Sequence, residues 1–290
     1  MILALMGPTG SGKSELALRL AKEIDGEILN GDAFQVYSSF PIATASPSLE
    51  DKKEVAHHLY NFVPSSVRYD IAAYQKDARD AIKDVLNRGK TPILVGGSGL
   101  YIRSALYDYD LSLDTSNVDM SRFENMCNED LHGFLEKLDS VEASKIPYQN
   151  RRRLLRSIAI CLALGESKTS FLSRQKHIPL FETKFYRLSL PREEVYSRIE
   201  RRVERMFMEG IEKEVLSGIE GVSEVIGVYQ AIGVKEFFPY RDGKASLSET
   251  KEAIVLDTKR FVKRQETFFR HQFDAKSVSG LEDILDDFRN

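Results

Sequence analysis

The fold is decided by MILALMGPTGSGKSELALRLA, residues 1–21. An apolar run at 2–6 meets a glycine-rich turn, and the segment that follows places the apolar residues of 16–21 on one face of a helix. The turn fits the pattern G-x-x-x-x-G-K-[ST] at every fixed position. The stretch therefore predicts a strand, a phosphate-binding loop and an amphipathic helix in direct succession.

The glycine-rich turn at 7–14 suits a polyphosphate for physical reasons. Glycine permits backbone angles that a Cβ forbids, so successive N–H groups can converge on an anion. The helix begins near Lys13, and its dipole favours negative charge at that end. Lys13 adds a mobile cation, and Ser14 offers a hydroxyl to Mg²⁺. We expect the anion to contact Gly7, Pro8, Thr9, Gly10, Ser11, Gly12, Lys13 and Ser14. A chance glycine-rich turn is the alternative, and the motif does not identify the polyphosphate.

Composition narrows the class of protein. The chain has 290 residues, of which 42% are hydrophobic and 29% charged, which predicts a folded soluble protein of one large or two smaller domains. We find no long apolar run and no basic leader, so we expect a cytoplasmic protein without a membrane span. Cys127 and Cys161 indicate neither a zinc site nor a disulfide framework. The net charge of −3 argues against an indiscriminate nucleic-acid binder.

The first 106 residues alternate strand and helix patterns, which implies a parallel sheet. Asp70 is positioned to cap one of the helices. The expected strands are 2–6, 27–30, 57–62 and 91–95, and the expected helices are 14–24, 71–86 and a helix opening at 100–102.

The composition changes after residue 108. We expect a linker at 108–119 and a helical stretch at 120–173 that breaks at Pro147. A strand at 185–190 then returns the chain to the sheet, followed by long helices at 193–217 and 247–273. This order predicts an α/β fold, a P-loop NTPase-like parallel sheet flanked by helices, with an all-helical insertion. The expected domains are 1–114 with 176–290 for the catalytic core, and 115–175 for the insertion.

Positive charge is gathered in three clusters whose spacings of three and four residues place several side chains on one helix face. Solvated helix faces paired with glutamates such as Glu200 and Glu204 are one interpretation. Three such clusters in an acidic protein favour binding of a polyanion. The clusters are Arg151, Arg152, Arg153 and Arg156; Arg198, Arg201, Arg202 and Arg205; and Lys259, Arg260, Lys263, Arg264 and Arg270.

Candidate chemical groups follow the ends of two expected strands, where α/β sheets bind ligands. Asp32 can hold Mg²⁺ through water or take a proton from a nucleophile, although a turn cap is the alternative. Gln35 is able to donate to and accept from an adenine edge, or is a surface glutamine. Ser98, in the glycine-rich turn 96–99, can reach the same cleft as Lys13.

Motifs along nearly the whole chain resemble those of the tRNA dimethylallyltransferase family, which prenylates adenosine 37 beside the anticodon. They occur in the order of the family, and their combination is far more specific than the phosphate-binding loop. The motifs are GPTGSGKS at 7–14, DAFQVY at 32–37, HHL at 57–59, LVGGSGLYIR at 94–103, RRRLLR at 151–156, RIERR at 198–202, QAIGVKE at 230–236 and TKRFVKRQETFFR at 258–270.

The resemblance implies a chemistry. It places the diphosphate of dimethylallyl diphosphate, rather than ATP, on the phosphate-binding loop, with side chains of Thr9, Lys13 and Ser14 contributing. It implies that Asp32 is the general base toward the adenine N6 amine and that Arg202 clamps the diphosphate. The implied catalytic residues are Asp32, Lys13 and Arg202, with Mg²⁺ as cofactor and Ser14 as its ligand.

The same resemblance implies contacts with tRNA. The stretch 115–175 matches the insertion that grips the anticodon stem-loop. The family usually has serine after the aspartate, where this chain has Ala33, so no side-chain role follows at that position. The matching tRNA-contact positions are Asp32, Ala33, Phe34, Gln35, Ser98, Arg152, Arg153, Arg156, Lys263 and Arg264. We expect a monomer without a membrane partner.

Other functions are compatible with the phosphate-binding loop considered by itself. A P-loop kinase of a nucleotide or small metabolite shares the fold, because a fold does not fix chemistry. An adenylate isopentenyltransferase shares the donor, but the long helical insertion and the basic C-terminal helix favour a larger RNA acceptor. A GTP switch is disfavoured because the sequence lacks an N-K-x-D guanine-reading motif.

Overall fold

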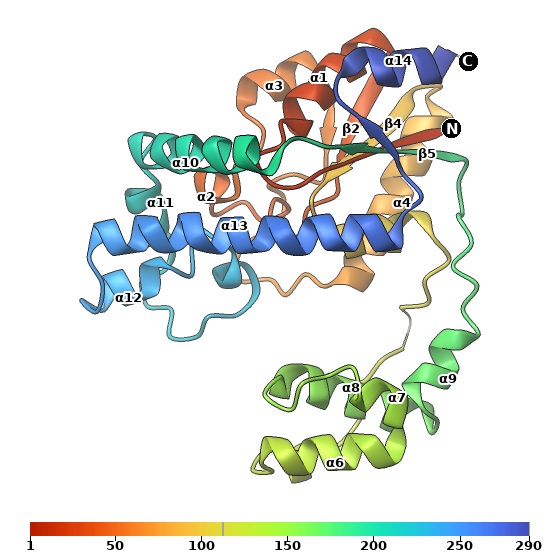
Figure 1. Ribbon diagram of the computed structural model, residues 1–290, viewed down its shortest axis with the longest axis vertical. Helices are drawn as coiled ribbons and strands as arrows, with labels where there is room; N and C mark the ends of the chain where they lie inside the picture. The colour runs from red at the N-terminus through yellow and green to blue at the C-terminus, as the bar shows by residue number, and fades with distance from the viewer. Residues whose placement is uncertain (112, 290) are drawn as a thin grey trace. The chain divides into compact units, whose positions relative to one another are not determined.

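The computed structural model describes residues 1–111 and 113–289. Its sheet has the strand order β3-β2-β4-β1-β5-β6, and all its neighbouring strands pair in parallel (Figure 1). The predicted parallel sheet is therefore confirmed. The strands are β1 (Ile2–Met6), β2 (Gly26–Asn30), β3 (His57–His58), β4 (Thr91–Gly96), β5 (Thr183–Leu188) and β6 (Lys276–Val278).

Helices follow most strands, as the alternating sequence pattern predicts. Asp70 caps α4 by accepting hydrogen bonds from the N–H groups of Ala72 and Ala73, as expected. The α-helices are α1 (Lys13–Glu23), α2 (Pro41–Thr44), α3 (Leu49–Glu54), α4 (Ile71–Asn87), α5 (Gly99–Leu106), α6 (Asn128–Leu138), α7 (Ser140–Ala143), α8 (Arg151–Leu164), α9 (Lys168–Ser173), α10 (Arg192–Met208), α11 (Ile211–Gly218), α12 (Phe237–Arg241), α13 (Leu247–Gln272) and α14 (Leu281–Arg289). Short 3₁₀ turns lie at Ser121–Phe123 and Gly227–Gln230.

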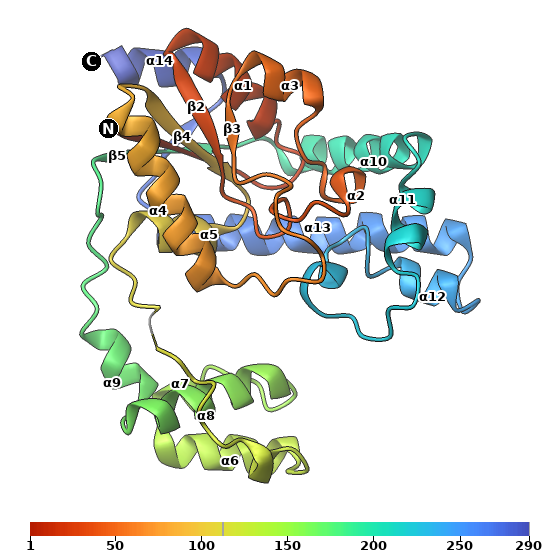
Figure 2. The same ribbon diagram turned by 180° about the vertical axis from the view of Figure 1, so that it is seen from behind.

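Both faces of the sheet are buried, which is why its strands read as continuous apolar runs. Leu3 and Leu5 of β1 pack with α1 and α14, while Ile2 and Ala4, which point the other way, are fully buried as well. Helix α4 contacts β2 and β4 from that second side. Figures 1 and 2 show α1 and α14 above the sheet and α4 below it.

The chain divides into two compact units. Residues 1–106 and 179–290 form the α/β unit, and residues 107–178 form the helical unit. The helical unit has an apolar core of its own from α6, α7 and α8, including Leu131, Leu154 and Ile158. Asp139 ties its short helices together by accepting hydrogen bonds from the N–H groups of Glu142 and Thr169. Within the described residues, no helix is both long enough and apolar enough to cross a bilayer.

Several expected elements differ in the structure. The helix expected at 193–217 is divided into α10 and α11, because Gly210 adopts a left-handed φ of 94° between them. The strand expected at 57–62 ends after His58, because Leu59 and Asn61 have φ values of 66° and 55°. The stretch 120–173 also breaks at Asp139 and Gly165, besides the break near Pro147.

A buried carboxylate anchors the β2 edge of the sheet. Glu27 is 4% exposed and accepts hydrogen bonds from Arg88, and His58 of the neighbouring strand lies 2.6 Å away. The Arg88 guanidinium, assisted by His58, lowers the pKa of Glu27 to about 2. His58 therefore contributes to the anchoring of this edge of the sheet.

Candidate active site

The phosphate-binding loop presents unpaired backbone donors at the start of α1. Gly12 is the N-cap residue, with a left-handed φ of 89°, and no side chain caps the helix. The first N–H groups of α1 are thus available to an anion, which the helix dipole also favours. Arg198 of α10 holds the loop in place, since it donates to the carbonyl of Ser11 at 3.2 Å and pairs with Glu194. Arg198 therefore has a structural role beside the loop.

Asp32 is held at the carboxyl end of β2 by its neighbours. Its backbone N–H donates to Asn30 Oδ1 at 2.8 Å, while Asn30 in turn donates to the carbonyls of Asp32 and Leu59. The Ser98 hydroxyl lies 3.4 Å from Asp32 Oδ1 and accepts a hydrogen bond from the N–H of Ala33. The glycine-rich turn 96–99 thus contacts Asp32 through Ser98.

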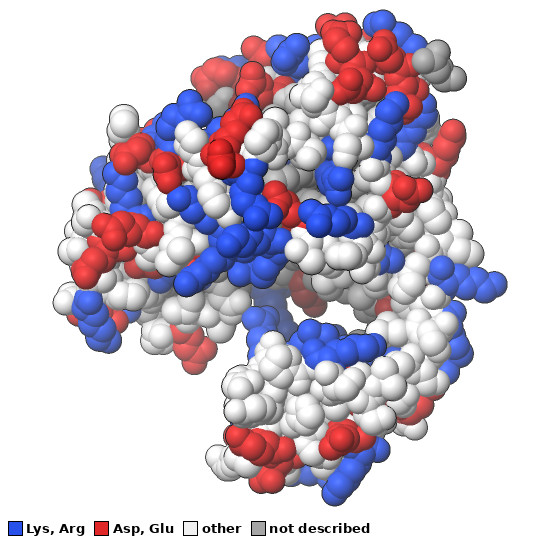
Figure 3. All heavy atoms as spheres, in the orientation of Figure 1, with Lys and Arg blue, Asp and Glu red and all other residues white. Residues whose placement is uncertain are grey.

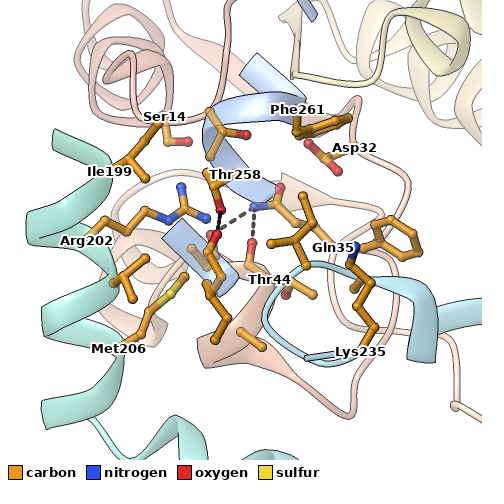
Figure 4. Close-up of a pocket in the computed structure, with 18 of the residues that line it drawn as sticks. Ser14, Asp32, Gln35, Thr44, Ile199, Arg202, Met206, Lys235, Thr258 and Phe261 are labelled. Atoms are coloured by element: carbon orange, nitrogen blue, oxygen red, sulfur yellow. Dashed lines mark hydrogen bonds between the residues drawn. The ribbon is translucent and has the colours of Figure 1, made fainter. Parts of the chain in front are cut away.

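Asp32 lines a cavity of about 240 Å³ together with Thr9, Lys13 and Ser14 of the phosphate-binding loop. Its polar residues include Lys13, Asp32 and Arg202, and its apolar wall comes mainly from α10, α13 and the segment 230–232. Figure 4 shows Ser14 and Asp32 at one end of the view, and Met206 and Lys235 at the other. The cavity therefore joins charged and apolar parts, which suits an amphipathic ligand with a charged head.

Burial dominates the electrostatics of the cavity. Burial lowers the pKa of Lys13 to about 8; the nearby Asp32 opposes that shift, and Arg202 adds to it. Burial also lowers the pKa of Arg202, again against the influence of Asp32. Among the described residues, Arg202 forms no hydrogen bond or ion pair. Two cations beside one carboxylate favour an anionic ligand.

Gln35 has its amide orientation fixed by the loop after α2. Its Nε2 donates to the carbonyls of Thr44 and Ala45 at 3.0 and 2.8 Å (Figure 4). Both partners are acceptors, so the group between them is the NH₂ and both its hydrogens are used. Gln35 therefore offers the cavity an acceptor, Oε1, instead of the donor and acceptor that the sequence analysis expected.

Helices α10 and α13 pack against each other over the cavity. A ladder of ion pairs joins them: Lys251 with Glu204 at 2.6 Å, Lys259 with Glu200 at 2.6 Å, and Arg192 with Glu266 at 3.4 Å. Figure 3 shows Lys and Arg side chains gathered over these two helices. The interpretation of solvated helix faces thus holds for Lys259, while Arg202 and Arg264 line the cavity.

The cavity gathers part of the predicted site. Its lining includes Thr9, Lys13, Ser14, Asp32, Phe34, Gln35, Arg202 and Arg264. Ser98 joins them through Asp32, whereas Lys263 is exposed and does not line the cavity. Arg152, Arg153 and Arg156 belong to the helical unit, where all three are exposed.

Several residues of the cavity are not predicted from the sequence. They are Ala43, Thr44, Ala45, Tyr60, Val95, Ile199, Val203, Met206, Gln230, Ala231, Ile232, Lys235, Ile254, Thr258 and Phe261. Some of them stand inside motifs already noted, because Lys235 is in QAIGVKE and Phe261 is in TKRFVKRQETFFR. Those motifs were a signal for a site, but they did not say which of their residues face it.

Comparisons with known proteins identify the family of the chain. A family model described as "IPP transferase" matches residues 35–272. The chain belongs to the IPP transferase family. It is 38% identical to a tRNA dimethylallyltransferase of Carboxydothermus hydrogenoformans, with 98% of this chain and 95% of that protein covered, and 36% identical to one of Anoxybacillus flavithermus, with 98% and 92% covered.

Solved structures of the family share the fold. The tRNA delta(2)-isopentenylpyrophosphate transferase of Staphylococcus epidermidis has a TM-score of 0.72 and 31% identity, covering 99% of this chain and 97% of that one. A eukaryotic dimethylallyltransferase, described as acting on tRNA, has a TM-score of 0.81 and 29% identity, covering 92% of this chain and 69% of that one. The family thus keeps its fold at about 30% identity.

Proposed function

We propose that this protein transfers a dimethylallyl group from dimethylallyl diphosphate to N6 of adenosine 37 in the tRNA anticodon loop and releases diphosphate. Membership of the family supports the reaction class. The observation that carries the proposal is the single cavity in which Lys13, Asp32 and Arg202 meet an apolar wall. A diphosphate and a short branched hydrocarbon match its two kinds of lining.

The donor end of the reaction develops negative charge on a leaving group. As the allylic C–O bond breaks, its electron pair goes to the diphosphate. The N–H groups at the start of α1, together with Lys13 and Arg202, would stabilise that charge as it develops. Removing one such donor typically costs about 3–4 kcal/mol of transition-state stabilisation, so we expect this effect to dominate the rate.

At the adenine, the reaction requires a group that accepts a proton from N6. An exocyclic adenine amine is a weak nucleophile, so the new N6–C bond must form as an N6 proton passes to Asp32. Gln35 Oε1, whose amide is fixed by Thr44 and Ala45, is available to accept the second N6 hydrogen. Two acceptors around the amine would favour adenine over a base with a carbonyl at that position.

Mg²⁺ fits the residues of the cavity. The Ser14 hydroxyl and the Asp32 carboxylate are oxygen donors that line it together. The described residues contain no group of three or more His, Cys, Asp or Glu side chains that could cage a metal, and Mg²⁺ usually binds through few protein oxygens plus phosphates and water. When bound, the ion would neutralise charge on the diphosphate. Ser14 would hold it, and Asp32 would do so through water.

The apolar wall would hold the prenyl group and exclude water. Val203, Met206 and Ile254 belong to this wall and are buried. Exclusion matters because water competes with adenine for an allylic cation. Since adenine N6 is inaccessible in a stacked loop, the base must also turn outward to enter.

Contacts with the rest of the tRNA complete the proposal. The exposed arginines of α8, together with Lys263 and Arg264 of α13, would position the phosphates of the anticodon stem-loop. Phe34, Gln35 and Ser98 would stand near the modified base, while Ala33 offers only its backbone. Because the acceptor is tRNA, we place the reaction in the cytoplasm, and we expect a monomer, which light scattering can check.

The proposal is tested by incubating the protein with unmodified tRNA, dimethylallyl diphosphate and Mg²⁺, followed by mass spectrometry of the digested tRNA. We expect one dimethylallyl group on adenosine 37. Asp32→Asn should abolish the transfer while inorganic pyrophosphate still binds. Prenylation of free adenylate but not of tRNA, or phosphorylation of a small acceptor by ATP, would contradict the proposal.

A further inference from the structure

Gln265 of α13 is a buried side chain that contacts two loops of the active site at once. Its Oε1 accepts a hydrogen bond from the N–H of Thr9 at 2.9 Å, and its Nε2 donates to the carbonyl of Gly97 at 2.8 Å. The residue is 4% exposed. One amide therefore bridges the phosphate-binding loop and the glycine-rich turn 96–99.

The turn accepts α13 at close range because it lacks side chains at two positions. A Cβ on Gly97 would lie 2.3 Å from Nε2 of Gln265, and a Cβ on Gly99 would lie 2.3 Å from the ring of Phe268. Both separations are far shorter than real contacts. The backbone of the turn thus rests directly on α13, and its position depends on the side chains it meets there.

The position of the turn 96–99 affects the position of Asp32, the proposed base. Ser98 follows Gly97, and its hydroxyl contacts both Asp32 Oδ1 and the N–H of Ala33. Its own N–H donates to the carbonyl of Gly31 at 3.2 Å. A displacement of Gly97 therefore moves Ser98, and with it the carboxylate that would take the N6 proton.

We propose that Gln265 is a positioning residue that sets the spacing between the phosphate-binding loop and Asp32. The inference rests on the proposed function, in which the leaving diphosphate lies on one of these loops and the base stands beside the other. A misplacement of about 1 Å can reduce a rate about 100-fold. An amide suits this position because it donates and accepts at the same time.

Gln265→Glu tests the inference with the smallest change of shape. The carboxylate keeps an acceptor for the N–H of Thr9 but loses the donor to Gly97 and sets two oxygens against each other. We expect the single-turnover rate of prenyl transfer to tRNA to fall about 10- to 100-fold. The Kd of inorganic pyrophosphate with Mg²⁺, measured by calorimetry, should stay within about threefold of the wild-type value, because the donors of α1 remain.

A double-mutant cycle separates positioning from a general structural role. Ser98→Ala cuts the connection between the turn and Asp32. If Gln265 acts through Ser98, the rate loss caused by Gln265→Glu is smaller in the Ser98→Ala background than in the wild type. Losses that simply multiply would overturn the inference.

Two further variants keep the result interpretable. Gln265→Met retains the volume of the side chain and removes both hydrogen bonds, and it replaces Gln265→Glu if that variant fails to fold. Assayed below its unfolding temperature, Gln265→Met should show the same fall in rate. Gln272→Glu, exposed on the same helix and in contact with Arg103, should keep the wild-type rate. An inactive wild-type protein would contradict the proposed function, whereas an active one with an unchanged Gln265→Glu rate would overturn this inference alone.

Discussion

Helices α8 and α10 carry the same kind of sequence and use it differently. Both have arginines at spacings of three and four residues. On α10, Arg202 lines the cavity and has no hydrogen bond or ion pair among the described residues. On α8, Arg151 donates to the carbonyls of Phe123, Glu124 and Met126 at 2.9, 2.7 and 2.5 Å, within its own unit.

The difference shows that a charge pattern identifies a helix face but not the role of each charge. Within each run, the tertiary structure uses some arginines to hold backbone carbonyls, as it does with Arg198 and Arg151, and leaves others exposed or facing a cavity. The arginines that are exposed or face the cavity are the candidates for anions from outside the fold. Four predictions test this division.

The largest effect is expected at Arg202. Arg202→Met removes a cation from the leaving group, so kcat/KM for prenyl transfer should fall about 100- to 1,000-fold, with an unchanged unfolding temperature. Arg201→Met is the matched control, because that neighbour is exposed and, within the described part of the chain, its one hydrogen bond is to the carbonyl of Ser197 at 3.5 Å. Steady-state kinetics of both variants give the comparison. If Arg202→Met keeps wild-type kinetics, α10 does not supply the clamp.

The second effect concerns the exposed arginines of α8. Changing Arg152, Arg153 and Arg156 together to Gln should weaken tRNA binding about 10- to 100-fold and reduce the slope of log K against log salt by about 2 to 3. Filter binding at several salt concentrations measures both. Arg174→Gln, in the same unit and paired with Glu166, should leave the slope unchanged. An unaltered slope in the triple variant would show that the cluster does not meet phosphate.

The third effect is on the stability of the helical unit, and it concerns an arginine that holds backbone carbonyls. Arg151→Met leaves several carbonyls without a donor and should destabilise the helical unit by about 2–3 kcal/mol. Hydrogen exchange of residues 121–138 in the full chain reports this locally. Arg153→Met is the control, since its nearest carboxylate, Glu142, is 3.8 Å away, and it should cost less than about 1 kcal/mol. Equal effects would remove the distinction between the two positions.

The smallest effect is expected in the ladder between α10 and α13. Lys259→Gln breaks a half-exposed pair with Glu200 and should lower the free energy of unfolding by at most about 1 kcal/mol, without changing kcat. Urea denaturation and steady-state kinetics provide the two values. A large loss of kcat would instead place Lys259 among the residues that handle the substrate.

Much of the fold could be predicted from local patterns in the sequence. Strand β1, the phosphate-binding loop and α1 follow one another without a gap, so a single stretch of sequence specified all three. Asp32 was found because parallel strands bring their carboxyl ends to one edge of the sheet. The weak short strand β6 and the break at Gly210 were missed, because neither leaves a clear periodic pattern.

Only part of the site could be predicted from the sequence. The residue type predicts that Gln35 both donates and accepts, whereas the carbonyls of Thr44 and Ala45 use both its hydrogens. Arg198 and Arg202 stand four positions apart and look alike, and only the packing of α10 on the phosphate-binding loop distinguishes them. No local sequence pattern predicts these contacts, because each depends on which groups another segment of the chain brings near.

By itself, the sequence determined the parallel α/β architecture, the anion-binding turn and the carboxylate at the neighbouring strand end, since these depend on residue type and short spacing. Only the tertiary structure decided which arginines hold backbone carbonyls and which face the cavity, what closes the apolar part of the cavity and how Gln265 joins two loops separated from it by 256 and 168 positions. The physical reason is that hydrogen-bond partners and burial are set by contacts between distant segments, which residue order alone does not specify.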